Sequence, residues 1–198
     1  MVIVKSPVNL PIFKEKLAFV LDNVLTEDEC IALIEETEEK GYEQALLNVG
    51  AGRQVLDTSY RNSKRCIIDS EEKAKWLWEK VQDYVPATWK SFPVAGLNER
   101  LRFLKYEPGD YFKPHMDGTF ARPDGSEVSY ITVQLYLNSD MEGGNTTFLS
   151  NKDSTKDVGV APKAGRVLVF QHDILHEGSF LKKGVKYAMR TDVMYKHK

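Results

Sequence analysis

The second half of the chain alternates apolar and polar residues with a period of two, a pattern typical of strands that are buried on one face. The alternation begins near residue 100 and is clearest over residues 129–137. Its odd positions are apolar and its even positions are polar or aromatic: Ile131, Val133, Leu135 and Leu137 against Thr132, Gln134 and Tyr136. A strand with one polar inner face suits a barrel that encloses a site.

The first half of the chain contains helix signals instead. Thr26-Glu-Asp-Glu29 has the pattern of a capping box, so a helix should begin there and end at Gly41. A second helix should begin after Ser70 and close before Pro86. Helices followed by many short strands predict a mainly β fold with flanking α, in which a jelly-roll core carries the N-terminal helices on its outer sheet.

Length and charge limit the class of protein. The 198 residues are 42% hydrophobic and 28% charged, which suits a single domain over residues 1–198. We expect residues 1–99 to form a helical and strand support region that starts with an irregular arm over 1–16. Residues 100–195 should form the jelly-roll core. The net charge of −2 disfavours nucleic acid as an obligate partner.

The sequence gives no signal for a membrane or an oxidising compartment. No apolar run approaches the length of a membrane span, and the apolar residues before Lys5 are too few for a signal peptide. Cys30 and Cys66 lie far apart and lack the spacing of metal ligands. We therefore expect a reducing compartment, with a cytoplasmic or nuclear location.

A histidine and an aspartate lie two residues apart at His115 and Asp117, in a segment expected to be extended. Alternate side chains of a strand point to the same face, so the imidazole and the carboxylate should project together. They would supply two of the three ligands of a 2-His-1-carboxylate triad, the arrangement that holds non-heme Fe(II). The alternative is that this pair simply marks the end of a strand that enters a turn.

A third ligand has to come from another histidine. His197 is next to the C-terminus, whereas His172 and His176 both follow the apolar strand expected over residues 167–170. His172 lies between polar neighbours that indicate a turn. His176 lies in a short apolar run that could return it to the barrel, and we therefore favour it.

The strand expected to be the last one carries two cations on one face, Lys186 and Arg190. Burying them unpaired would be costly, so each needs an anionic partner. The partner is either an acidic residue of the protein or a bound dicarboxylate such as 2-oxoglutarate. An arginine would hold a carboxylate through a two-donor fork and a lysine as a point charge.

Taken together, the motifs of the second half resemble the catalytic domain of prolyl 4-hydroxylases. These enzymes are Fe(II)/2-oxoglutarate dioxygenases with a double-stranded β-helix, or jelly-roll, core. The resemblance extends over residues 100–195 and rests on motifs that occur in the family's order: Tyr106-x4-Tyr111-x3-His115-x-Asp117, Tyr136-Leu-Asn138, Gly143-Gly144-x-Thr146, Pro162-x2-Gly165, Phe170, His176-Glu-Gly178 and Gly184-x-Lys186-Tyr187.

The resemblance implies roles for individual residues. The implied iron ligands, which are also the catalytic residues, are His115, Asp117 and His176. The implied 2-oxoglutarate pocket is lined by Lys186, Tyr106, Tyr136 and Thr146, with Arg190 as the alternative cation. The implied cofactors are Fe(II), 2-oxoglutarate as co-substrate, O2 and ascorbate. Because members that halogenate lack the carboxylate ligand, Asp117 implies hydroxylation, with release of succinate and CO2.

The substrate stays open at the level of sequence. The family implies a prolyl or other residue in a protein, but the ending Arg190-Thr-Asp-Val-Met-Tyr195 departs from the aromatic-rich ending of collagen-type enzymes. A free amino acid, another small metabolite or an alkylated base is the alternative. A jelly roll that only binds a ligand would need neither Lys186 nor Tyr106, so these two residues argue against it.

Specificity should come from residues 42–66 and 118–128. Residues 118–129 should form either a mobile lid over the pocket or a plain connection between strands. Arg61 and Arg65 either line the mouth of a pocket or are surface cations, and the sequence slightly favours the surface.

Overall fold

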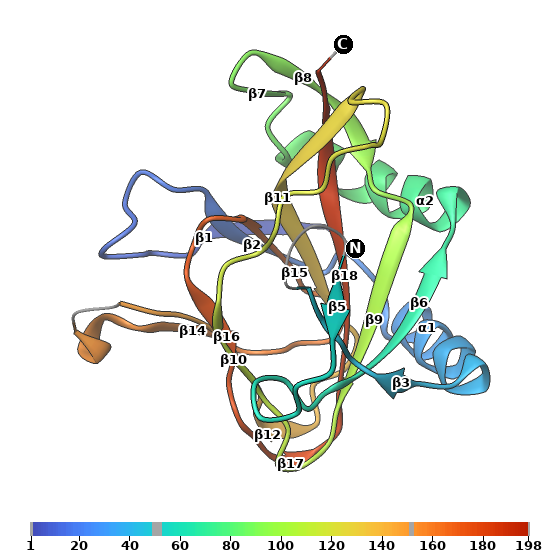
Figure 1. Ribbon diagram of the computed structural model, residues 1–198, viewed down its shortest axis with the longest axis vertical. Helices are drawn as coiled ribbons and strands as arrows, with labels where there is room; N and C mark the ends of the chain where they lie inside the picture. The colour runs from blue at the N-terminus through green and yellow to red at the C-terminus, as the bar shows by residue number, and fades with distance from the viewer. Residues whose placement is uncertain (1, 49–52, 151–152, 198) are drawn as a thin grey trace.

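The computed structural model describes residues 2–48, 53–150 and 153–197. Within these ranges, a larger and a smaller antiparallel sheet lie face to face (Figure 1). The larger sheet has the strand order β1 (Val4–Pro7), β2 (Ala18–Asp22), β15 (Val167–Gln171), β11 (Glu127–Tyr136), β18 (Lys186–Lys196), β9 (Arg100–Tyr106), β6 (Lys64–Asp69) and β3 (Glu43–Gln44). Strand β8 (Phe92–Leu97) also pairs with β18, and β7 (Thr88–Trp89) pairs with β8.

The smaller sheet supplies the other wall of the barrel. Its strand order is β10 (Phe112–His115), β16 (His176–Gly178), β13 (Thr146–Phe148) and β14 (Val158–Val160). Further short strands pair outside both sheets: β12 (Met141–Gly143) with β17 (Leu181–Gly184), and β4 (Leu47–Asn48) with β5 (Gln54–Val55). A 3-10 turn, η2 (Ser154–Lys156), precedes β14.

The helices begin at the predicted capping residues. Helix α1 (Glu27–Lys40) has a complete capping box, in which the Thr26 hydroxyl accepts from the Glu29 N–H and the Glu29 carboxylate accepts from the Thr26 N–H. Helix α2 (Glu71–Val81) is capped by the Ser70 side chain. It ends at Val81, earlier than the predicted close before Pro86, because the 3-10 turn η1 (Gln82–Tyr84) replaces its last turn.

One hydrophobic core lies between the helices and the larger sheet. The buried side chains of both helices, such as Leu33 and Leu77, belong to the same cluster as the odd-numbered residues of β11. Figure 1 shows α1 and α2 on one side of the larger sheet and β10, β16 and β14 on the other. The helices therefore leave the second face of this sheet free to form the site.

A second core and a cavity lie between the two sheets. Phe148 and Val160 of the smaller sheet pack with Tyr136, Phe170 and Ala188 of the larger one. The predicted alternation is confirmed from Ile131 onward, since Ile131, Val133 and Leu135 enter the helix-side core whereas Thr132, Gln134 and Tyr136 face this interior. None of the helices in the described ranges is long and apolar enough to cross a membrane.

The N-terminal arm is more ordered than predicted. Residues 4–7 form the edge strand β1 of the larger sheet, paired antiparallel with β2, so an irregular arm over 1–16 is wrong for this segment. The Lys5 ammonium lies 4.0 Å from the centroid of the Phe19 ring and donates to the Tyr84 carbonyl. The strand is mostly exposed and has no apolar alternation, and for this reason the sequence pattern did not reveal it.

Candidate active site

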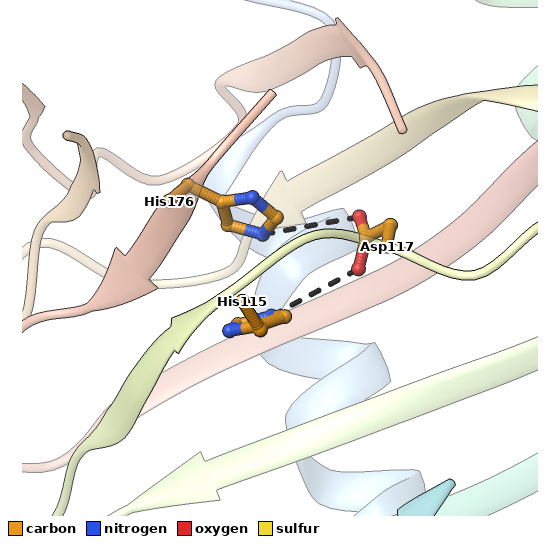
Figure 2. A group of neighbouring side chains, drawn as sticks. All are labelled: His115, Asp117 and His176. Atoms are coloured by element: carbon orange, nitrogen blue, oxygen red, sulfur yellow. Dashed lines mark ion pairs between the residues drawn. The ribbon is translucent and has the colours of Figure 1, made fainter. Parts of the chain in front are cut away.

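His115 and His176 are brought together by strand pairing across the smaller sheet. His115 ends β10, His176 begins β16, and the two are direct cross-strand partners. Asp117 follows just beyond β10, where its backbone N–H donates to the His172 carbonyl over 2.9 Å. The Nε2 atoms of His115 and His176 each lie 3.9 Å from a carboxylate oxygen of Asp117 (Figure 2). One potential ligand atom from each residue therefore lies within 4.8 Å of the others.

Both imidazoles are held in the tautomer that a metal needs. The Nδ1 atom of His115 lies 2.8 Å from the Lys113 carbonyl oxygen, and that of His176 lies 2.9 Å from the Ile174 carbonyl oxygen. A carbonyl oxygen can only accept, so each Nδ1 carries the proton and each Nε2 presents a lone pair. The two lone pairs lie on the side of each ring that approaches Asp117.

The protonation states also suit a divalent cation. Burial, together with the neighbouring His176, lowers the pKa of His115 to about 3. Burial also lowers the pKa of His176. Burial would raise the pKa of Asp117, but Arg190 and the two histidines outweigh it and hold that pKa below its usual range. Two neutral imidazoles and one carboxylate fit the donor set of a non-heme Fe(II) site.

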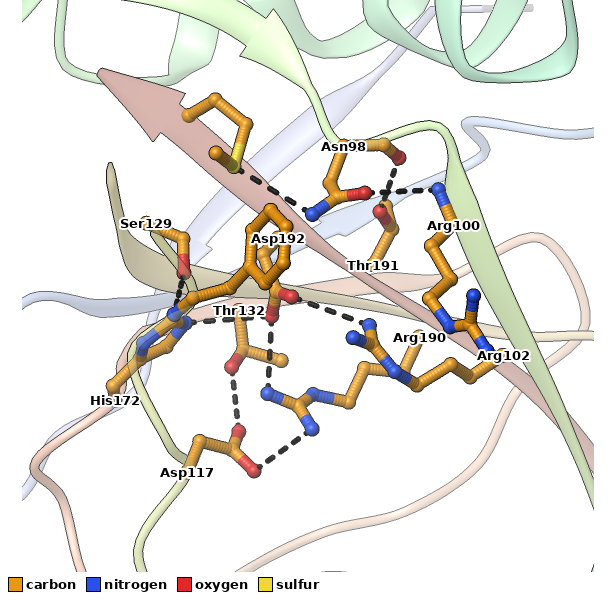
Figure 3. Close-up of polar contacts among 12 residues, drawn as sticks. Asn98, Arg100, Arg102, Asp117, Ser129, Thr132, His172, Arg190, Thr191 and Asp192 are labelled. Atoms are coloured by element: carbon orange, nitrogen blue, oxygen red, sulfur yellow. Dashed lines mark hydrogen bonds and ion pairs between the residues drawn. The ribbon is translucent and has the colours of Figure 1, made fainter. Parts of the chain in front are cut away.

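The carboxylate of Asp117 is fixed by two side chains from the larger sheet (Figure 3). The Thr132 hydroxyl donates to Oδ2 over 2.5 Å, and Nη1 of Arg190 lies 3.3 Å from Oδ1. Arg190 is held in turn by Asp192, whose Oδ1 accepts from its Nη2 over 3.0 Å. These contacts leave the carboxylate little freedom to rotate.

Asp192 is the buried centre of this polar network. Besides Arg190, it accepts from Nη1 of Arg102 over 3.2 Å, and Nε2 of His172 lies 3.4 Å from its Oδ1. Neither Asp192 nor Thr132 was among the site residues predicted from sequence. The available signal for Asp192 was an acid on the same strand face as the cations Lys186 and Arg190, where it could pair with one of them.

The structure separates the two histidines that sequence left as alternatives. His176 lies beside His115 and Asp117, whereas His172 lies behind Asp117, against Asp192. His172 is buried, and within the described residues neither of its ring nitrogens has a hydrogen-bond partner. It is therefore placed to support the network and not to complete the cluster of three ligand atoms.

Lys186 lies deep in the cavity and only 2% of its surface is exposed. Its ammonium donates to the Gly144 carbonyl over 2.5 Å and lies over the rings of Tyr106 and Tyr136, at 4.9 and 5.6 Å from their centroids. Burial lowers its pKa to about 7. Among the described residues it forms no ion pair, in contrast to Arg190, so a bound anion would be its first charged partner.

Hydroxyl groups of Thr146 and Tyr106 lie in the same cavity as Lys186. The Thr146 oxygen accepts from Nε2 of Gln134 and from the hydroxyl of Tyr136, both over 2.8 Å. With both lone pairs used, the Thr146 O–H is left as a donor to the cavity. The Tyr106 side chain also lines the cavity, and its hydroxyl has no hydrogen bond to any residue in the described ranges. Tyr136 itself acts through Thr146 and is not part of the cavity wall.

Glycine and asparagine residues set the position of Lys186. Gly144 has a φ of +69°, and a Cβ there would lie 3.0 Å from Leu181 and 3.3 Å from the Lys186 side chain. Only glycine allows this backbone conformation and this close approach together. The Asn138 side chain accepts from the Tyr187 N–H and donates to the Val185 carbonyl, which fixes the backbone on both sides of Lys186.

The segments expected to set specificity differ in where they lie. Arg61 lines the cavity, whereas Arg65 is not part of the cavity wall and pairs with Glu43. Residues 49–52 lie outside the described ranges. No residue of 118–128 belongs to the cavity wall. Arg122 of that segment is tied to Glu99 and Glu127 at the far end of the larger sheet.

Comparison with known proteins supports the family suggested by the motifs. A model of the 2OG-Fe(II) oxygenase superfamily matches residues 101–191. Probable prolyl 4-hydroxylase 11 of Arabidopsis thaliana is 30% identical over 170 residues, covering 80% of this chain and 57% of that protein. Probable prolyl 4-hydroxylase 8 of the same plant is 29% identical over 150 residues, covering 73% and 49%. The chain thus spans about half the length of these relatives.

Solved structures share the fold. A prolyl hydroxylase from Trichoplax adhaerens, solved in complex with a peptide fragment of hypoxia inducible factor, superposes with a TM-score of 0.69 at 20% identity and covers 89% of this chain and 82% of that one. A Pseudomonas putida prolyl-4-hydroxylase has a TM-score of 0.62 at 17% identity, with 91% and 92% covered. These likenesses confirm the predicted jelly-roll core. From the family match, the relatives and the fold together, the chain belongs to the 2OG-Fe(II) oxygenase superfamily, among its prolyl 4-hydroxylase-like members.

Proposed function

We propose that this protein is an Fe(II)- and 2-oxoglutarate-dependent dioxygenase that hydroxylates a prolyl or other residue in a protein. One observation carries the proposal. A cluster of two imidazoles and a carboxylate shares one cavity with a separate lysine that has no acidic partner in the described part of the chain. The first group suits a metal ion and the second suits the far carboxylate of a dicarboxylic acid. A site that only binds one ligand would not need both.

The residues present fit both groups. Fe(II) would be held by Nε2 of His115, Nε2 of His176 and the carboxylate of Asp117, whose protonation states are already those of ligands. The far carboxylate of 2-oxoglutarate would be held by the Lys186 ammonium, with the hydroxyls of Tyr106 and Thr146 as further donors. Charge-assisted hydrogen bonds of this kind are the strong ones in a protein interior.

The protein's own contribution to the reaction is position and exclusion of water. Iron with 2-oxoglutarate and O2 supplies the chemistry, in which one substrate is hydroxylated for each succinate and CO2 released. Arg190 and Thr132 hold the Asp117 carboxylate in one orientation. The carbonyls of Lys113 and Ile174 keep the two imidazoles in one tautomer. Leu104 and Ala188 of the larger sheet form apolar parts of the cavity wall between these groups.

Support for a peptide substrate comes from the relatives, because the Trichoplax protein is a prolyl hydroxylase solved with a peptide fragment. A capped proline peptide is therefore the first substrate to test. The purified protein should release succinate from 2-oxoglutarate in the presence of Fe(II) and ascorbate, and a suitable peptide should stimulate that release. Iron-dependent succinate release no greater than that of an Asp117→Ala variant would rule out the proposed activity.

We further propose that the whole chain works as one domain. Strands from residues 1–99 lie on both sides of the strands from residues 100–195 in the larger sheet, and side chains of both parts share one core, so neither part has a complete core of its own. We also propose a cytoplasmic location, which the two buried and unpaired cysteines, Cys30 and Cys66, support.

A further inference from the structure

The cavity is lined by more cations than the proposed function uses. Lys186 is assigned to 2-oxoglutarate, and Arg102 and Arg190 share the buried carboxylate of Asp192. Arg61 is the remaining cation of the cavity wall, and it forms no ion pair with any residue in the described ranges. The residues outside those ranges include no Asp or Glu, so they add no acidic side chain that could pair with it.

Arg61 is held in place from two sides. Its Nε donates to the hydroxyl of the buried Ser63 over 3.0 Å, and its guanidinium lies 4.6 Å from the centroid of the Phe112 ring. A backbone bridge also joins Arg61 to Phe112. Because Nε is occupied, the two terminal nitrogens of the guanidinium are the donors left over, and they form the fork that matches a carboxylate.

Arg61 is also close to the reacting centre. The Phe112 ring stacks on His115 with centroids 3.6 Å apart, so the guanidinium is separated from one candidate metal ligand by a single ring. Burial lowers the pKa of Arg61, and the neighbouring Arg190 lowers it further. The carboxylate of Glu177 lines the same cavity, but it accepts from Ser179 and forms no ion pair with Arg61 in the described structure. An anion at this point would compensate a cation that is partly buried and has no ion-pair partner in the described ranges.

We propose that Arg61 binds a carboxylate of the substrate, so that the protein selects substrates carrying a negative group next to the carbon that is hydroxylated. This inference rests on the proposed function and names the substrate class of the same site. The carboxylate can come from two sources: the side chain of a Glu or Asp beside the target residue in a peptide, or the α-carboxylate of a free amino acid.

The test measures binding separately from turnover. Protein loaded with Mn(II) and 2-oxoglutarate is titrated by calorimetry with two matched pairs of ligands: capped Glu-Pro-Glu against capped Gln-Pro-Gln, and L-proline against L-prolinamide. The first pair tests a side-chain carboxylate and the second an α-carboxylate. We expect the carboxylate member of one pair to bind about ten- to a hundred-fold more tightly than its amide partner.

The Arg61→Gln variant should lose that preference, and Arg65→Gln is the matched control. Arg65 lies on the same segment but pairs with Glu43 outside the cavity, so its loss should leave the preference intact. Should the glutamine variant fail to fold, Arg61→Lys retains the charge without the fork and should show a smaller preference than wild type.

Two results would overturn the inference. One is that neither pair shows a preference in the wild type, including the case in which none of the four ligands binds. The other is that Arg61→Gln keeps the preference, or loses affinity for 2-oxoglutarate instead, which would place Arg61 in the co-substrate pocket. Succinate release by the wild type without any peptide tests the proposed function on its own. A protein that releases succinate but has no carboxylate preference refutes only the role of Arg61.

Discussion

Nη1 of Arg190 lies 3.3 Å from Oδ1 of Asp117. Its other terminal nitrogen, Nη2, donates to Asp192, so both ends of this guanidinium are occupied by carboxylates of the protein. Lys186, four residues earlier on the same strand, donates only to a backbone carbonyl. The two cations that sequence could not distinguish are therefore in different positions: one supports a candidate metal ligand and the other is open to a bound acid.

This difference in position predicts that the Lys186→Ala and Arg190→Ala variants lose different functions. Lys186→Ala should raise the Michaelis constant for 2-oxoglutarate by roughly ten- to a hundred-fold, because a charge-assisted hydrogen bond contributes about 1.5–3 kcal/mol. Arg190→Ala should chiefly weaken metal affinity, because it frees the Asp117 carboxylate. The measurements are 2-oxoglutarate dependence of turnover at saturating iron and a Mn(II) titration. A shift in the Michaelis constant that appears only in the arginine variant would assign the clamp to Arg190.

Asp117→Ala should abolish hydroxylation and weaken Fe(II) binding, because it removes the anionic ligand of the cluster. Loss of a residue that merely supports a ligand typically costs 10- to 100-fold in metal affinity, so loss of the ligand should cost more than about a hundred-fold. The control is Asp173→Ala, which removes an exposed carboxylate paired with Lys16. Wild-type metal affinity in the Asp117 variant would disprove the triad.

The two histidines near the end of β15 should also differ. His176→Ala should lose metal binding, because its Nε2 lies 3.9 Å from Asp117. His172→Ala should bind the metal with at most a modest loss, because His172 contacts Asp192 and not the cluster. Equilibrium titration of both variants with Mn(II) measures their metal affinities and shows which histidine is the ligand. The assignment is wrong if the His172 variant loses the metal while the His176 variant keeps it.

The buried lysine predicts a pH effect on stability in the metal-free protein. Burial lowers the pKa of Lys186 from 10.5 to about 7. Between these values the unfolded chain binds more protons than the folded one, so the free energy of unfolding rises with pH and falls as pH drops towards 7. Relative to Lys186→Met, the wild type should therefore gain stability as pH rises from 7 towards 10. Parallel stability profiles of the two proteins across that range would contradict the buried charge.

Local signals in the sequence predicted local structure well. The capping box at Thr26 and the cap at Ser70 act within one helical turn, and the alternation over residues 129–137 reports burial of a single strand directly. Of the residues that the family motifs indicated, His115, Asp117, His176 and Lys186 line the cavity, whereas Tyr136 lies behind Thr146 and does not.

Contacts between segments that are distant in the chain could not be predicted from the sequence in the same way. The edge strand β1 has no alternation of its own, and its partner in the larger sheet follows from tertiary contacts. The role of Asp192 depends on Arg102, 90 positions earlier in the chain. The position of Arg61 in the cavity, which the sequence slightly disfavoured, depends on the backbone bridge between Arg61 and Phe112. Each of these is a contact between distant segments, on which single-sequence patterns carry no information.

The central strand β18 carries Lys186, Ala188, Arg190 and Asp192 at alternate positions, facing the interior. Because side chains alternate, gaining or losing one residue within this strand would turn every residue beyond the change to the opposite face. Replacement of a single residue, by contrast, can change one contact at a time. A one-codon deletion in the same stretch would therefore remove several cavity contacts in a single step. Natural variants of β18 should thus differ by substitution, with changes of length confined to the turns on either side.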